Sequence, residues 1–281
     1  MKNILKLVVF LMVMSLTSVP TPVQAFNPAT HLYIADNVFP DCINKIDLYY
    51  GSIAPDLALY VANPEVNWPT AFVDTHYTYM DLRSNAYGSR QKAFAKGWLT
   101  HNEEWGADHW AHIEGFGVSG SLGYVIEKAG DLLVHFPGLG DDFAHYAIEV
   151  AIDLLLKNNH DPKLGAKLLV ANWLRSWQDR YLLAKVLVWQ RPGRTDWLTL
   201  ATAEFTFRSI VHRYAMALAL PFPKDKEALA GLGAQLAWEM YGIDITPEVV
   251  GMLLEAALGL CEYDYECAIL FTIEQIQNEL Q

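Results

Sequence analysis

Three histidines and three carboxylates occur within twelve residues of this chain, in the segment HNEEWGADHWAH at residues 101–112. Imidazole nitrogens and carboxylate oxygens are the ligands that zinc takes in proteins when thiolates are absent. Asp108 and His112 are four residues apart, so in a helix they would share one face, about one turn from each other. The segment therefore predicts a metal site, although such pairs also occur as hydrogen-bonded pairs on helix surfaces.

A second pair with this spacing lies in DDFAHYAIEVAID at residues 141–153, where His145 and Glu149 are four apart. Asp153, four residues further on, could orient a ligand as a hydrogen-bond acceptor. Histidine is also unevenly distributed, because seven of the nine lie between residues 31 and 145. We therefore expect the site in the N-terminal half of the chain, with the helices after residue 163 as scaffold.

His101 poses a problem of distance. It would lie seven residues before Asp108 on one helix face, which is a rise of roughly 10 Å and is long for two ligands of one ion. Gly106 could bend the helix between them. Otherwise Glu104, three residues after His101, is the better-placed carboxylate, whereas Glu103 and Glu114 are interpreted as solvated. Both assignments of the carboxylate stay open.

Helical periodicity dominates the chain after residue 26 and predicts the elements that must position these side chains. Apolar residues recur at helical spacing, bounded by Pro, Gly, Asn or Asp, over 30–39, 41–50, 87–114, 141–158, 163–190, 195–219, 224–241 and 246–279. Strand-like alternation is hardly seen, and no Pro/Ser/Gly-rich linker divides the chain. We predict an all-α fold with a single multi-helix domain, in which a stripe such as Trp173, Trp177 and Leu183 serves packing.

The first 25 residues, MKNILKLVVFLMVMSLTSVPTPVQA, have the lysines, apolar run and small-residue end of a secretory signal peptide. Their twelve-residue apolar run is short of the roughly 20 residues that a membrane anchor requires. We expect cleavage after Ala25 and a secreted or periplasmic protein whose domain spans residues 26–281.

Composition restricts the partners and the metal ligands. The formal charge of −12 becomes −14 when Lys2 and Lys6 are removed with the signal peptide. Such an acidic surface repels nucleic acid, so no stable nucleic-acid partner is expected.

None of the three cysteines has zinc-finger spacing. Cys261 and Cys267 could pair, which would leave Cys42 unpaired.

Cleavage after Ala25 would place His31 six residues into the mature chain, close to a free α-amino group. An α-amine has an ordinary pKa near 8 and can become a metal ligand once deprotonated. An aromatic N-terminus, an early His, then Asp, His, a helix with His, Asp and His, and finally H-x3-E resembles the trinuclear zinc phospholipase C family. The related three-zinc nucleases that cut single-stranded nucleic acid share this pattern. The resemblance covers residues 26 to about 153, and both families are all-α.

The resemblance implies up to three zinc ions held within residues 26–153, with residues 163–281 as helical scaffold. One zinc ion would take Asp56, His76, His101 and Asp108. A second would take His112, His145 and Glu149. The third would take the amine and carbonyl of Phe26 with His31, and would share Asp108 as a bridge.

Two details of the pattern bear on this assignment. The families place the bridging Asp four residues after the helix His and the next His six residues later, whereas here the gaps are seven and four. Glu104 therefore remains an alternative bridge. The pair H-x3-E resembles the phospholipases, since the nucleases more often carry H-x3-D.

By resemblance, the protein would be an exported zinc-dependent phosphodiesterase of the phospholipase C type. A metal-activated water would hydrolyse phospholipid to diacylglycerol and a phosphorylated head group, and Asp56 would orient or deprotonate that water. A cationic head group could rest on Tyr77, Tyr79 or Trp105. We expect a monomer that makes transient contact with a membrane surface. The alternatives are a zinc-dependent single-strand-specific nuclease and an exported zinc-binding protein without catalysis, whose metals stabilise the fold.

Overall fold

The computed structural model describes residues 27–61, 68–77, 79–116 and 121–281, which are helical and contain no strand. The prediction of an all-α fold is confirmed. The predicted signal peptide and Phe26 lie outside the described residues. None of the helices in the described ranges combines the length and the apolar character that a membrane crossing needs.

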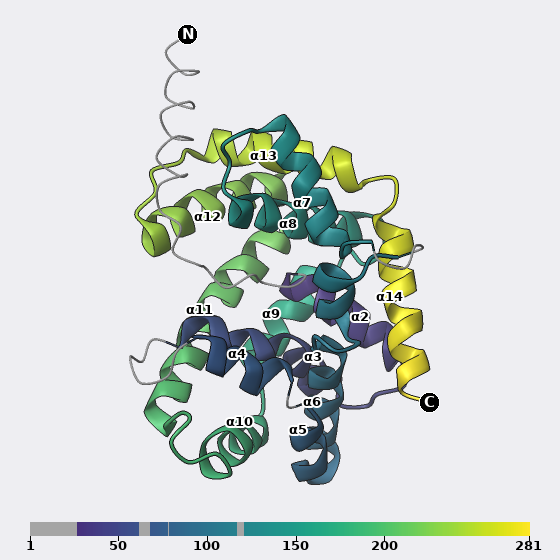
Figure 1. Ribbon diagram of the computed structural model, residues 1–281, viewed down its shortest axis with the longest axis vertical. Helices are drawn as coiled ribbons and strands as arrows, with labels where there is room; N and C mark the ends of the chain where they lie inside the picture. The colour runs from purple at the N-terminus through teal and green to yellow at the C-terminus, as the bar shows by residue number, and fades with distance from the viewer. Residues whose placement is uncertain (1–26, 62–67, 78, 117–120) are drawn as a thin grey trace.

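Figure 1 shows α7, α8, α12 and α13 at one end of the molecule and α5, α6 and α10 at the other, with α2 between them. The α-helices are α2 (Pro28–Val38), α3 (Lys45–Ile53), α4 (Trp68–His76), α5 (Tyr79–Asn85), α6 (Gly88–His101), α7 (Tyr124–His135), α8 (Asp141–Asn159), α9 (Leu164–Leu174), α10 (Trp177–Leu183), α11 (Trp197–Leu218), α12 (Lys224–Tyr241), α13 (Pro247–Cys261) and α14 (Tyr265–Glu279). The 3₁₀-helix η1 (Ala54–Tyr60) continues α3, and two π-helices are η2 (His109–Ile113) and η3 (Ala184–Trp189).

Three of the predicted helices are shorter than their periodicity indicated. The helix expected over 87–114 ends at His101, and the helix expected over 246–279 is divided into α13 and α14. The helix expected over 163–190 consists of α9, α10 and η3, because a capping box of Ser176 and Asp179 starts a new helix at Trp177. Helices α4, α5 and α7 were not predicted; each has only seven to twelve residues.

The prediction that Trp173, Trp177 and Leu183 form a packing stripe is wrong for the two tryptophans. Trp173 and Trp177 are 73% and 72% exposed, so they do not serve packing, whereas Leu183 is buried. Cys261 is buried and Cys267 is exposed, and both are free thiols, as is Cys42. The suggested disulfide is therefore not formed in this structure.

Helices α3 and α6 approach until their backbones touch. A Cβ atom on Gly97 would lie 2.0 Å from the carbonyl oxygen of Leu48, and one on Gly51 would lie 2.1 Å from that of Phe94. Only glycine allows this separation. The close approach places His101, at the end of α6, against the backbone of Ser52 on α3.

We expect Gly97→Ala to lower the free energy of unfolding by about 2–3 kcal/mol, because its methyl group would overlap backbone atoms. Gly130 on α7 is the matched control, since a Cβ atom there meets nothing within 4 Å. Gly130→Ala should raise stability by up to about 1 kcal/mol through its higher helix propensity. Urea unfolding of both variants measures the difference, and equal shifts would contradict the close approach.

Candidate metal centre

A tight turn joins α6 to η2 and brings His101 and Asp108 together. The Oδ1 atom of Asn102 accepts hydrogen bonds from the backbone N–H groups of Glu104, Trp105 and Gly106. A Cβ atom on Gly106 would lie 2.5 Å from the carbonyl oxygen of Asn102, so this position also requires glycine. The chain thus leaves the helix at Asn102, and the problem of rise along one helix disappears. The prediction that His101, Asp108 and His112 share one helix face was wrong.

The first ligand group consists of Asp56, His76, His101 and Asp108. The Nε2 atoms of His76 and His101 lie 3.3 Å apart, and Oδ2 of Asp108 lies 3.3 Å and 3.2 Å from them, respectively. The Oδ1 atom of Asp56 lies 3.5 Å from Nε2 of His101 and 3.9 Å from Nε2 of His76. Nitrogen and oxygen ligands of a tetrahedral zinc ion stand about 3.3 Å from one another. Asp56, His76 and His101 thus offer ligand atoms within 4.8 Å of one another, and Oδ2 of Asp108 lies beside the two imidazoles of this group.

Backbone carbonyls orient two of these imidazoles. Nδ1 of His101 lies 2.8 Å from the carbonyl oxygen of Ser52, and Nδ1 of His76 lies 3.2 Å from that of Phe72. Because a carbonyl oxygen can only accept, the ring proton belongs on Nδ1 and the lone pair on Nε2. The hydroxyl of Thr75 also lies 2.7 Å from Nδ1 of His76. The nitrogen that faces the first group is thus the one that can bind a metal.

The ligand atoms of His31, His101 and Asp108 also lie within 4.8 Å of one another. Since Nε2 of His101 already faces the first group, the second ligand group adds His31 and Oδ1 of Asp108. Oδ1 of Asp108 lies 3.5 Å from Nε2 of His31, while its Oδ2 faces the first group. The His31 ring stacks on that of His101 at a centroid distance of 4.0 Å. Asp108 therefore presents one oxygen to each group, which is the geometry of a bridging carboxylate.

Asp153 holds the start of α2, the helix that carries His31. Its carboxylate accepts hydrogen bonds from the backbone N–H groups of Ala29 and Thr30 at 3.3 Å and 2.7 Å, and from the Tyr214 hydroxyl at 2.7 Å. A carboxylate at a helix N-terminus is favoured both by the unpaired N–H groups and by the helix dipole. Asp153 thus fixes the start of the helix that carries His31, and its expected role in orienting a ligand stays a prediction.

The third ligand group consists of His112, His145 and Glu149. The two Nε2 atoms lie 3.2 Å apart, and Oε1 of Glu149 lies 2.7 Å from Nε2 of His145. Oε2 of Glu149 is buried and accepts no hydrogen bond from the described residues. A buried carboxylate oxygen without a donor is costly unless a cation compensates it.

Glu103 is a site residue that the sequence interpretation missed. It was expected to be solvated, but it is only 8% exposed, and its Oε1 lies 3.5 Å from Nδ1 of His112. This carboxylate orients the His112 ring from outside the ligand group, as acidic partners do for metal-binding histidines. Glu104, the alternative bridge, instead accepts a hydrogen bond from the Tyr79 hydroxyl and is exposed.

The electrostatics of the site favour bound cations. Burial and the nearby carboxylates of Asp56 and Asp153 raise the pKa of Glu149 well above its usual range. Burial opposes the charged form of His101, but Asp108 and Asp56 outweigh it and raise the pKa of that imidazole. Burial and His101 lower the pKa of His31. Four buried acids, Asp56, Asp108, Glu149 and Asp153, thus lie in one cluster that bound cations would stabilise.

The three groups together account for eight of the nine predicted metal ligands, and the ninth, Phe26, lies outside the described residues. Asp56 also lines a large apolar cavity. The cluster could therefore bind divalent cations beside a cavity able to take an organic ligand.

No protein-family model matches the chain, and no solved structure matches it. A protein of Archaeoglobus fulgidus described as uncharacterized is 32% identical over 174 residues, which cover 52% of this chain and 48% of that protein. The chain thus spans about half the length of the relative that it matches. No function follows from these comparisons.

Proposed function

We propose that this protein is an exported zinc-dependent phosphodiesterase of the phospholipase C type. The observation that carries the proposal is the position of Asp108, whose two carboxylate oxygens face two adjacent ligand groups. Closely spaced metal sites that share a carboxylate suit in-line displacement at phosphorus, where both the attacking and the leaving oxygen need a cation. The ligand set of nitrogen and oxygen atoms is one that zinc takes in catalytic sites.

When bound, zinc ions would supply a hydroxide at neutral pH and neutralise the charge of the phosphate oxygens. The remaining tasks belong to side chains of this chain. Asp56 belongs to the first ligand group and also lines the cavity. In this proposal its carboxylate accepts a proton from the attacking water. Ser52, Phe72 and Glu103 hold the rings of His101, His76 and His112 in the orientation that their roles require.

The alternatives make different demands on the structure. A purely structural metal site is closed by protein ligands, whereas the first ligand group borders a cavity through Asp56. A nuclease for single strands would need cations or stacking aromatics along a groove beside the metals. The cavity contains no Lys or Arg, and its six aromatic side chains stand among a larger number of aliphatic ones. This lining favours a lipid phosphodiester over a nucleic acid.

The test is turnover of phosphatidylcholine, single-stranded DNA and a chromogenic phosphodiester by the purified protein, with zinc and with chelator. We expect chelator-sensitive hydrolysis of the lipid and of the chromogenic compound. Asp56→Asn should lower kcat by at least about 100-fold, as expected for loss of a base. Asp131→Asn, on the exposed face of α7, should leave it unchanged. Metal analysis of both variants separates loss of the base from loss of zinc, and absence of turnover on all three substrates would reject the proposal.

A further inference from the structure

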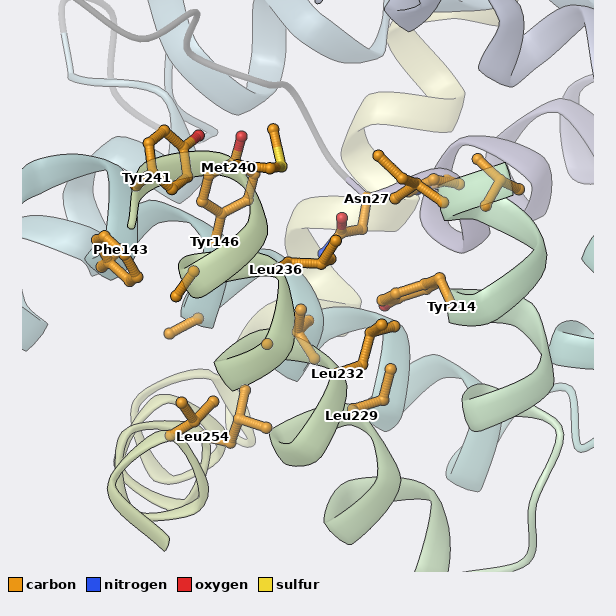
Figure 2. A pocket seen from close by; sticks show the side chains of 18 of the residues that line it. Asn27, Phe143, Tyr146, Tyr214, Leu229, Leu232, Leu236, Met240, Tyr241 and Leu254 are labelled. Atoms are coloured by element: carbon orange, nitrogen blue, oxygen red, sulfur yellow. The ribbon is translucent and has the colours of Figure 1, made fainter. Parts of the chain in front are cut away.

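A deep apolar cavity adjoins the metal centre. It has a volume of about 170 Å³ and is enclosed mainly by α8, α11, α12 and α13. Its walls are mostly aliphatic, and Figure 2 shows Leu229, Leu232 and Leu254 on one side and Tyr146 and Tyr241 on another. Ligand sites are lined predominantly by apolar side chains with a few polar groups, so this lining suits a hydrocarbon segment rather than a charged group.

Apart from the tyrosines, Asn27 and Asp56 are the polar residues in the lining. Asn27 precedes α2, and its side chain lies among those that surround the cavity (Figure 2). Asn27 is only 7% exposed, and its Nδ2 atom donates no hydrogen bond to any described residue. A buried amide donor without an acceptor costs free energy unless a ligand supplies one. The unsatisfied donor therefore indicates a hydrogen-bond acceptor on the ligand.

The positions of Asp56 and Asn27 in the lining indicate how a ligand would be oriented in the cavity. Asp56 marks the place where the cavity reaches the metal centre, so a phosphate there would be continuous with a chain in the cavity. Asn27 belongs to the same lining. An acyl ester has a carbonyl oxygen between its chain and its phosphate, and this oxygen would match the Asn27 donor.

We propose that the cavity binds one acyl chain of the phosphodiester substrate, with the Asn27 amide donating a hydrogen bond to the carbonyl oxygen of the ester that joins the chain to glycerol. The position of the phosphate rests on the proposed phosphodiesterase function. Binding of the chain itself rests on the apolar lining, in which Asp56 is the one proposed metal ligand.

The first experiment measures binding to metal-free protein by calorimetry. The probes are lysophosphatidylcholines below their micelle concentration, whose single acyl chains lengthen by two carbons at a time. Each buried methylene should tighten the dissociation constant about threefold to fourfold until the cavity is full. Dissociation constants that do not change with chain length would overturn the inference.

Two variants test the location. Ala237→Phe would fill the cavity from α12, where Ala237 is a buried lining residue. We expect at least tenfold weaker binding of the long-chain probes and unchanged binding of the shortest. Gln235→Phe places the same ring on the exposed face of α12 and should have no effect. Asn27→Ala should weaken binding about fivefold at every chain length. If Ala237→Phe fails to fold, as judged by circular dichroism, the chain-length series on the unmodified protein still decides.

The outcomes distinguish the two proposals. Chain-length-dependent binding without hydrolysis of any phosphodiester would reject the enzyme function and keep the acyl site. Hydrolysis of the chromogenic phosphodiester without chain-length-dependent binding would reject the acyl site and keep the enzyme function.

Discussion

Asp108→Ala should remove the carboxylate shared by the first and second ligand groups and lower kcat/KM for a phosphodiester at least about 1,000-fold. The expected loss is large because one carboxylate serves two ligand groups, through Oδ1 near His31 and Oδ2 near His76 and His101. Removing it leaves three imidazoles without their shared anion. We expect the purified variant to hold at least one zinc ion fewer per chain, as measured by mass spectrometry of the metals.

Glu104→Gln is the matched control, because Glu104 is the acid that sequence spacing left as an alternative bridge. Its partner is the Tyr79 hydroxyl, outside the ligand groups. The variant should keep its metal content and its kcat/KM within about twofold. If Glu104→Gln loses zinc while Asp108→Ala retains it, the bridging role of Asp108 is wrong.

Removal of the metals should produce the second large effect, a loss of stability that increases with pH. A ligand present at a thousandfold of its dissociation constant stabilises a fold by about 4 kcal/mol. Chelation removes this contribution and leaves Asp56, Asp108 and Glu149 buried without their cations. We expect a lower melting temperature in chelator and its recovery when zinc is added back.

Two raised pKa values make stability fall as pH rises, whereas the lowered pKa of His31 acts in the opposite direction as pH passes its unfolded value near 6.5. The raised pKa of Glu149 means that the metal-free fold retains a proton which the unfolded chain releases above about pH 4.3, so stability falls as pH rises. The raised pKa of His101 acts in the same direction, because the stabilising imidazolium is lost as pH passes its folded-state pKa. Asp108 has a lowered pKa and stays ionised above pH 5 in both states.

Thermal unfolding between pH 5 and pH 8, with zinc and with chelator, measures this effect. The gap in melting temperature between the two conditions should widen towards pH 8. His112→Ala should lose only part of the stabilisation by metal, because it removes one ligand of the third group. Its gap should be smaller than that of the unmodified protein. A melting temperature that chelator leaves unchanged at every pH would contradict bound metal in the native fold.

The order and types of the ligand residues were readable from the sequence alone. His145 and Glu149 are brought together by one turn of α8, and local spacing suffices to predict such a pair. The long apolar periodicities likewise predicted α8, α11 and α12, since an amphipathic helix repeats its apolar residues every three to four positions. The short helices α4, α5 and α7 lacked enough turns for this signal.

Contacts between distant segments were decided only by the tertiary structure. The side chain of Asn102 ends α6 and turns the chain, so that Asp108 reaches His101 in a way that helical spacing argued against. Glu103 lies on this turn and is buried beside His112, whereas its sequence context resembles that of a solvated acid. Likewise α11, α12 and α13, expected to be plain scaffold, form the walls of the acyl cavity. Periodicity records which residues share a helix face, but turn geometry and the packing of faces far apart in the chain determine what those faces enclose.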